Sequence, residues 1–133
     1  MIVLDSSAVI ALLLHLPAGQ AIEAQLHLRA TEQICAPELL DVEVASALRK
    51  HVALRVITLA RAEEALDDFI AFACKRFPHL PLVSRIWELR HNFSAYDATY
   101  VALAEELQAT LFTCDTRLAG APGLKSKVLL FRA

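Results

Sequence analysis

The chain has 133 residues, of which 56% are hydrophobic and 21% are charged, and its formal net charge at pH 7 is −2. This length fits one domain with one sizeable core, with no length left for a second. The low charge and the scarcity of glycine exclude a disordered tail or a flexible linker.

The spacing of apolar residues predicts strands and helices that alternate along the whole chain. The predicted strands cover residues 2–4, 33–36, 80–83, 110–114 and 127–131. The predicted helices cover residues 7–14, 18–28, 38–51, 58–75, a stretch that ends near 91, and 95–107, whereas 118–125 is predicted as a loop. Parallel neighbours need crossover connections, so we expect an α/β fold: a three-layer α/β/α sandwich around a mainly parallel five-stranded sheet.

The apolar segments are too short to cross a membrane. The longest uninterrupted apolar run covers residues 8–14, far short of the roughly 20 residues that a bilayer requires. We therefore expect a soluble, cytoplasmic protein. The three cysteines, Cys35, Cys74 and Cys114, are widely spaced, which argues against a disulfide framework or a zinc cluster and predicts buried thiols. The apolar excess in so small a domain predicts a surface that contacts another chain.

Two predicted strands end in an aspartate. Asp5 follows the first strand, and Asp115 follows the strand at 110–114. In open α/β sheets, ligands bind at the carboxyl ends of the strands, so both carboxylates are expected at a binding edge. Each residue could instead cap a helix or form a turn, and for Asp5 alone capping is as good an interpretation. The repetition at two strand ends favours a site.

Two further acids lie on predicted helices. Asp97 stands three residues after Ser94, which is a capping-box spacing, but it also borders the apolar stripe of its helix and is expected to point toward the sheet. Glu43 falls inside the apolar arc of its helix, where a carboxylate needs a partner. A salt bridge with Lys50, two turns along the same helix, is the structural alternative.

Four carboxylates brought together would be partly protonated unless a cation neutralised them. An all-oxygen ligand set favours Mg²⁺ or Mn²⁺ over zinc. Such a site predicts phosphodiester hydrolysis by a metal-activated water. Neutralising four acids would leave the rest of the surface with a net charge of about +2, which does not repel a polyanion.

The order of these motifs resembles that of the PIN-domain ribonucleases, specifically the VapC toxins of bacterial and archaeal toxin–antitoxin pairs. The resemblance covers essentially the whole chain. It rests on Asp5-Ser-Ser-Ala, Ala36-Pro-Glu-Leu-Leu-Asp-Val-Glu43, Ser94-Ala-Tyr-Asp97 and Thr113-Cys-Asp115-Thr-Arg. It implies a five-stranded parallel sheet sandwiched by helices, which agrees with the predicted elements.

The resemblance also implies a function, a cofactor and partners. Asp5, Glu43, Asp97 and Asp115 match the acidic quartet that holds Mg²⁺ or Mn²⁺, Thr113 matches a supporting hydroxyl, and Ser6 matches a position near the metal. The implied activity is that of an endoribonuclease toxin acting on RNA. The implied partners are a VapB-like antitoxin, whose C-terminal segment lies in a groove between helices and can place a basic side chain in the site, and further copies in a homodimer or higher assembly.

Contacts to RNA are less well marked. The segment 52–57 is compact and hydrophobic and offers no basic loop, so the candidates for phosphate contact are scattered. They are Arg117, which is the best of them, Lys50, Arg90 and Asn92, together with Arg85 and Lys125. The alternative for each is an ordinary polar or charged side chain on the surface. Two alternative functions stay open: a non-catalytic PIN module that binds a protein or RNA, and a DNA nuclease.

Overall fold

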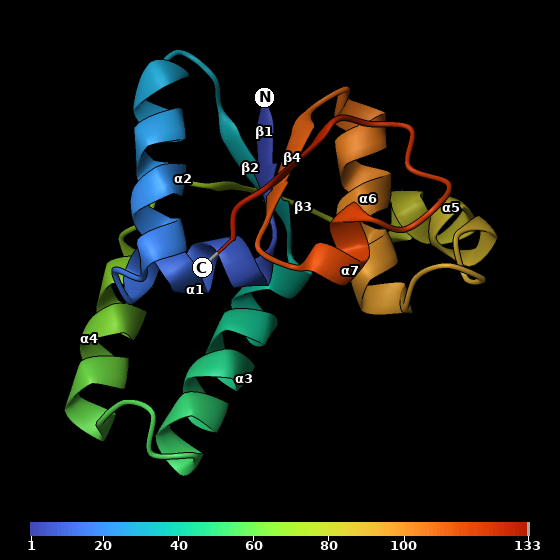
Figure 1. Cartoon of the computed structure of the whole chain (residues 1–133). Helices are drawn as coiled ribbons and strands as arrows, with labels where there is room; N and C mark the ends of the chain where they lie inside the picture. Colours follow the sequence, from blue (N-terminus) through green and yellow to red (C-terminus); the bar gives the residue numbers. More distant parts are fainter. Residues whose placement is uncertain (133) are drawn as a thin grey trace.

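A five-stranded parallel sheet forms the centre of the protein in the computed structural model, which describes residues 1–132 (Figure 1). The strands are β1 (Ile2–Leu4), β2 (Ile34–Pro37), β3 (Lys75–Phe77), β4 (Thr110–Thr113) and β5 (Val128–Leu130), in the spatial order β3-β2-β1-β4-β5. All four neighbouring pairs are parallel. Leu4 pairs with Phe112, so the residues that follow β1 and β4 emerge at the same edge.

Helices cover both faces of this sheet. They are α1 (Ser6–Leu13), α2 (Pro17–Leu28), α3 (Leu39–Ala53), α4 (Leu59–Ile70), a 3₁₀ turn (Leu80–Leu82), α5 (Val83–Glu88), α6 (Ala95–Leu107) and α7 (Thr116–Ala119). Ile2 and Leu4 face a core beneath α1 to α4, whereas Val3 faces a second core beneath α5 and α6. The predicted three-layer sandwich is confirmed, because all three residues of β1 are buried between two helical layers.

The predicted strand at 80–83 is wrong, and so is the last turn of the predicted helix at 58–75. The chain forms a 3₁₀ turn at Leu80–Leu82, while α4 ends at Ile70 and is followed by β3. Strand β3 lies at the sheet edge with a charged sequence, Lys-Arg-Phe, so no apolar run marks it. Leu80 is 83% exposed, so the apolar residue that suggested a buried strand here is in fact on the surface. The start of the predicted loop at 118–125 belongs to α7.

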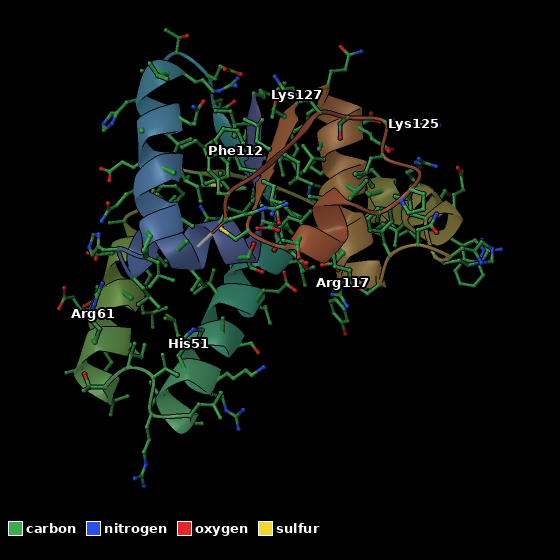
Figure 2. The ribbon with its side chains drawn as sticks, viewed as in Figure 1. His51, Arg61, Phe112, Arg117, Lys125 and Lys127 are labelled. Atoms are coloured by element: carbon green, nitrogen blue, oxygen red, sulfur yellow. The ribbon has the colours of Figure 1, made fainter. Side chains whose placement is uncertain are left out.

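Helices α3 and α4 form a hairpin that projects away from the sheet (Figure 1). Arg61 of α4 donates a hydrogen bond of 2.6 Å to the Leu13 carbonyl, which ties the hairpin to the end of α1 (Figure 2). Gly19 lets α2 approach α1 closely, because a Cβ there would lie 2.1 Å from the Ala11 carbonyl oxygen. These contacts fix α1, whose first turn carries part of the site described below.

Within residues 1–132, no single helix is long and apolar enough to span a bilayer. Helices α1 and α2 together have the required length and composition, but they meet at a bend of 100°. The three cysteines are free thiols in this part of the chain. Cys35 is buried as expected, whereas Cys74 and Cys114 are only half-buried.

Candidate active site

Asp5 stands at the carboxyl end of the central strand and is 5% exposed. Its Oδ1 accepts hydrogen bonds from the backbone amide of Ala8 at 2.9 Å and from the Ser7 hydroxyl at 2.6 Å. Its Oδ2 accepts a hydrogen bond from Thr113 of β4. Asp5 therefore caps α1, as the alternative interpretation held, and at the same time holds a carboxylate at the sheet edge.

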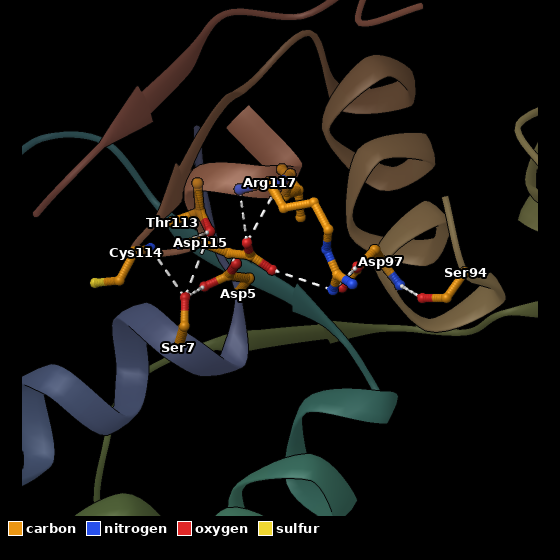
Figure 3. A network of polar contacts seen from close by, with 9 residues as sticks. Asp5, Ser7, Ser94, Asp97, Thr113, Cys114, Asp115 and Arg117 are labelled. Carbon is orange, nitrogen blue, oxygen red and sulfur yellow. Dashed lines mark hydrogen bonds and ion pairs between the residues drawn. The ribbon is translucent and has the colours of Figure 1, made fainter. Parts of the chain in front are cut away.

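Thr113 and Ser7 connect Asp5 to the turn after β4 (Figure 3). The Thr113 hydroxyl accepts the backbone amide of Asp115 at 3.0 Å, and the Ser7 hydroxyl accepts that of Cys114 at 2.9 Å. Asp115 in turn caps α7 by accepting the amides of Arg117 and Leu118. Two strand ends and two helix starts are thus joined in one polar network.

Asp97 enters the network from α6. Ser94 caps this helix by accepting the Asp97 amide at 3.2 Å, but within residues 1–132 no reciprocal bond joins the Asp97 carboxylate to the Ser94 amide. The predicted capping box is therefore only half formed, and the carboxylate is left for other partners. The guanidinium of Arg117 lies 3.6 Å from Asp97 Oδ2 and 3.7 Å from Asp115 Oδ2, bridging the two acids (Figure 3).

Glu43 joins the site through Tyr100. The Tyr100 hydroxyl donates a hydrogen bond of 2.6 Å to Glu43 Oε1, linking α6 to α3. Tyr100 is 1% exposed. Burial, with Glu43 and Asp5 nearby, raises the pKa of Tyr100, so the phenol keeps its proton and remains a donor. The alternative partner for Glu43 is wrong, since within residues 1–132 no ion pair joins Glu43 to Lys50.

The electrostatics of the site disfavour so much negative charge. Burial raises the pKa of Asp5 from 3.8 to about 6, against the opposing hydrogen bonds, and Asp97 adds to the rise. The pKa of Asp97 is also raised, first by burial and then by Asp115, while Arg117 opposes the shift. The carboxylates are thus close enough to repel one another, and a cation would relieve this repulsion.

The side chains do not converge on one point. Within residues 1–132, no group of three or more His, Cys, Asp or Glu side chains is arranged to hold a metal ion. Instead, Thr113 bonds to Asp5 and to the amide of Asp115, and Arg117 pairs with Asp97 and Asp115. Glu43 is bound by Tyr100. The site therefore has the predicted residues at one sheet edge, with Arg117 as the cation between two of them.

Several predicted contact residues lie elsewhere or are already engaged. Arg85 donates two hydrogen bonds to Glu105, and Arg90 stacks 4.6 Å above Trp87. Lys125 lines a hollow with Thr110, at the opposite end of β4 from Thr113 (Figure 2). Of the candidates for RNA contact, the structure brings Arg117 and Asn92 beside Asp97.

Sequence reasoning missed Ser7 and Tyr100 as parts of the site. Ser7 bonds to Asp5, whereas Ser6, which was predicted to lie near the metal, lies beside the Tyr100 hydroxyl. A signal for Tyr100 was available, because a tyrosine on a buried stripe needs a hydrogen-bond partner and Asp97 stands one turn before it. No sequence signal separates Ser6 from Ser7.

Residues 2–124 match the family model of the PIN domain. Together with the parallel sheet and the acidic edge, this match shows that the chain belongs to the PIN-domain family. Several curated relatives of the chain are named as VapC ribonucleases. The chain is 48% identical to "Ribonuclease VapC1" of Mycobacterium tuberculosis over 98 residues, 73% of this chain and 74% of that protein. It is 38% identical to "Ribonuclease VapC12" of the same organism over 130 residues, 98% of each.

Solved structures agree on the fold. PAE2754 from Pyrobaculum aerophilum superimposes with a TM-score of 0.71 at 23% identity, covering 96% of this chain and 81% of that one. VapBC2 from Rickettsia felis, solved bound to a DNA fragment from its promoter, gives a TM-score of 0.73 at 16% identity, covering 98% and 99%. At these identities the likeness establishes the fold alone. The predicted PIN-like architecture and the VapC resemblance are both confirmed.

Proposed function

We propose that this protein is a metal-dependent endoribonuclease and the toxin of a toxin–antitoxin pair. The observation that carries the proposal is the acidic edge, where Asp5 is buried and its pKa is raised to about 6 with Asp97 nearby. Replacing one of these acids by a neutral residue would remove the repulsion between them. The presence of the acids despite this repulsion therefore favours a functional role for them. The relatives named as ribonucleases support RNA as the substrate.

The residue types at the acidic edge suit a hard divalent cation such as Mg²⁺ or Mn²⁺, although the carboxylates would have to draw together to hold it. The available donors are carboxylate and hydroxyl oxygens, which suit these ions and not zinc. Asp5, Asp97 and Asp115 would hold the ion, with Glu43 completing the acidic quartet. Arg117 now bridges Asp97 and Asp115, but its side chain is 84% exposed and free to move outward. A positive charge between these acids is therefore already favoured.

Such a cation, if bound, would lower the pKa of a water and stabilise charge on the phosphoryl oxygens. The protein's own residues orient the site. Thr113 and Ser7 fix both oxygens of Asp5, so the carboxylate cannot rotate away. Tyr100 holds Glu43 by donating its proton. Arg117 lies beside Asp97 and Asp115, so a phosphate bound at this edge would be close to its guanidinium, which would stabilise the developing charge.

The test is cleavage of total cellular RNA by antitoxin-free protein with Mg²⁺, Mn²⁺ or EDTA. Asp97→Asn should abolish metal-dependent cleavage, whereas Glu106→Gln, which removes an exposed acid from the same helix, should cleave like wild type. Circular dichroism should show all three proteins folded. Cleavage by Asp97→Asn at the wild-type rate contradicts the mechanism. Folded, metal-binding wild type that cuts no RNA favours a non-catalytic binding module instead.

The antitoxin has a candidate docking groove on the α3–α4 hairpin. An apolar hollow of about 300 Å³ lies between these helices and includes Leu48, Val52, Leu59 and Leu66 in its walls. A helical or extended apolar segment fits such a groove. Leu66→Glu should prevent co-purification with the antitoxin while RNA cleavage persists, whereas Leu28→Glu, at an exposed leucine of α2 outside the hairpin, should leave co-purification unchanged.

Self-association is also part of the proposal. Leu80, Val83 and Trp87 are 83%, 50% and 67% exposed and follow one another at helical spacing. Side chains at such spacing lie on one face, and exposed apolar faces of this kind mark contacts between chains. Light scattering of the antitoxin-free protein should give at least a dimer mass, and Trp87→Glu should reduce it to that of a monomer.

A further inference from the structure

A cavity of about 100 Å³ opens directly beside the acidic edge. It lies between the start of α6, the loop before it and α7, and Figure 3 shows Arg117 reaching across this region toward Asp97 and Ser94. Its lining residues are Asn92, Phe93, Ser94, Asp97, Arg117 and Leu118. Two of these, Asp97 and Arg117, also belong to the acidic edge, so the cavity and the candidate reaction centre share a wall.

The size of the cavity limits what it can accept. Binding pockets for whole small molecules have volumes of roughly 300–1,000 Å³, whereas a protein cavity of about 150 Å³ holds a single benzene ring. The cavity here is smaller, about 100 Å³, and is open on one side, so it can take at most one six-membered ring, with part of the ring outside. The bicyclic ring of a purine is too large to enter fully.

The chemistry of the lining points to a base rather than to an alkyl group. Phe93 and Leu118 are 7% and 2% exposed and supply apolar walls. Asn92 is exposed, and within residues 1–132 its side-chain amide makes no hydrogen bond. The side-chain nitrogen of Asn92 lies near Gly123, since a Cβ built on Gly123 would be 3.6 Å from it. The loop that contains Gly123 therefore lies behind this side chain. An amide offers one donor and one acceptor together, as the Watson–Crick edge of a pyrimidine does.

We propose that this cavity is a subsite for one pyrimidine base of a single-stranded RNA, next to the phosphate that is cut, and that Asn92 reads the edge of that base. The inference rests on the proposed function, because it places the RNA phosphate at the acidic edge. Proteins that recognise single-stranded RNA hold splayed bases in this way, with apolar or aromatic contact to the ring and hydrogen bonds to its edge. Sequence preference would then come from Asn92, while the acids act on phosphate alone.

Binding is tested first, without any need for cleavage. The side-chain amide signals of Asn92 are followed by nuclear magnetic resonance while UMP, AMP or ribose 5-phosphate is added. UMP should shift these signals at lower concentration than AMP, and ribose 5-phosphate should leave them in place. Asn92→Leu has no such side-chain signals, so its titration is followed by the backbone amide signals of Phe93 and Ser94, which line the same cavity. It should bind UMP about fivefold more weakly than wild type, the value of one hydrogen bond. Equal shifts by UMP and ribose 5-phosphate, or by UMP and AMP, overturn the base subsite.

Cleavage supplies the second test. Wild type, Asn92→Leu and the control Gln20→Leu, an exposed residue of α2, are given a pool of random RNA with Mn²⁺, and the fragment ends are sequenced. Wild type and control should prefer a pyrimidine at one position beside the cut, and Asn92→Leu should lose that preference by about fivefold to tenfold. An unchanged preference in Asn92→Leu overturns the inference. No cleavage by wild type contradicts the proposed function, and the binding test still decides the subsite.

Discussion

Replacing Asp5 by Asn should make the metal-free protein more stable at neutral pH. In the folded state burial raises the pKa of Asp5 from 3.8 to about 6. Between these values the folded protein holds a proton that the unfolded chain has released, so stability falls as pH rises. The difference of about 2 pKa units corresponds to roughly 3 kcal/mol of folding free energy. The wild-type protein has lost all of this stability above pH 6 and none of it below pH 4.

The substitution also has a cost, which does not depend on pH. An Asn at this position keeps an acceptor for the amide of Ala8 and the Ser7 hydroxyl, but its NH₂ group would face Thr113, which must then accept instead of donate. Rearranging one such hydrogen bond costs about 1 kcal/mol. The expected net gain for Asp5→Asn is therefore about 2 kcal/mol at pH 7.5, and at pH 4 we expect a loss of about 1 kcal/mol.

The assay is urea unfolding in EDTA at several pH values between 4 and 8, with Asp67→Asn on the exposed surface of α4 as the control. The free-energy difference between Asp5→Asn and wild type should change sign across this range, while that of the control should stay near zero. Adding Mn²⁺ at pH 7.5 should stabilise wild type more than Asp5→Asn, because only wild type keeps all the acidic ligands. A difference for Asp5→Asn that is the same at every pH would refute the reasoning.

Three further predictions concern the surroundings of the acids. Arg117→Gln removes a competing cation and should tighten Mn²⁺ binding by about two- to fivefold in calorimetry. Arg55→Asn, the same charge change at the tip of the hairpin, should leave Mn²⁺ binding unchanged. Equal effects of the two substitutions would show that only the net charge of the protein matters. Tyr100→Phe leaves Glu43 without its donor and should cost about 1–2 kcal/mol in urea unfolding, so wild-type stability would contradict the bond. His79 accepts a hydrogen bond of 2.8 Å from the first amide of α3. His79→Ala should therefore lower the free energy of unfolding in urea by about 1 kcal/mol, and His79→Gln by less. Equal losses in the two variants would argue against a capping role.

The strand-end acids could be predicted because their position depends on few assumptions. Once β1 and β4 are recognised as parallel strands of one sheet, Asp5 and Asp115 must emerge at the same edge, whatever the strand order. Glu43 and Asp97 follow from helical periodicity, since each lies at or within an apolar arc. These inferences use the directions of side chains on regular elements, which the sequence alone supplies.

The connections between these residues could not be predicted in the same way. Whether Ser6 or Ser7 reaches Asp5 depends on how the first turn of α1 is oriented after the strand. The two residues are both serine and are adjacent in the sequence, so the sequence does not distinguish them. Strand β3 was missed because it lies at the edge and pairs on one side only, so charged residues are tolerated in it. The cavity beside Asn92 is formed by residues near 93 and near 118, whose meeting depends on the tertiary fold.

Asp5 shows why a capping role and a functional role need not be alternatives. A carboxylate that only caps a helix gains from the helix amides, and such an acid normally has an ordinary or lowered pKa. Asp5 receives the amide of Ala8 and two hydroxyl groups, yet burial still raises its pKa to about 6. The cap therefore explains where the carboxylate lies but not why an ionisable group stands there, since an Asn or Ser would cap as well without the repulsion from Asp97. In the proposed function, a cation bound at this edge would recover what the fold loses at Asp5.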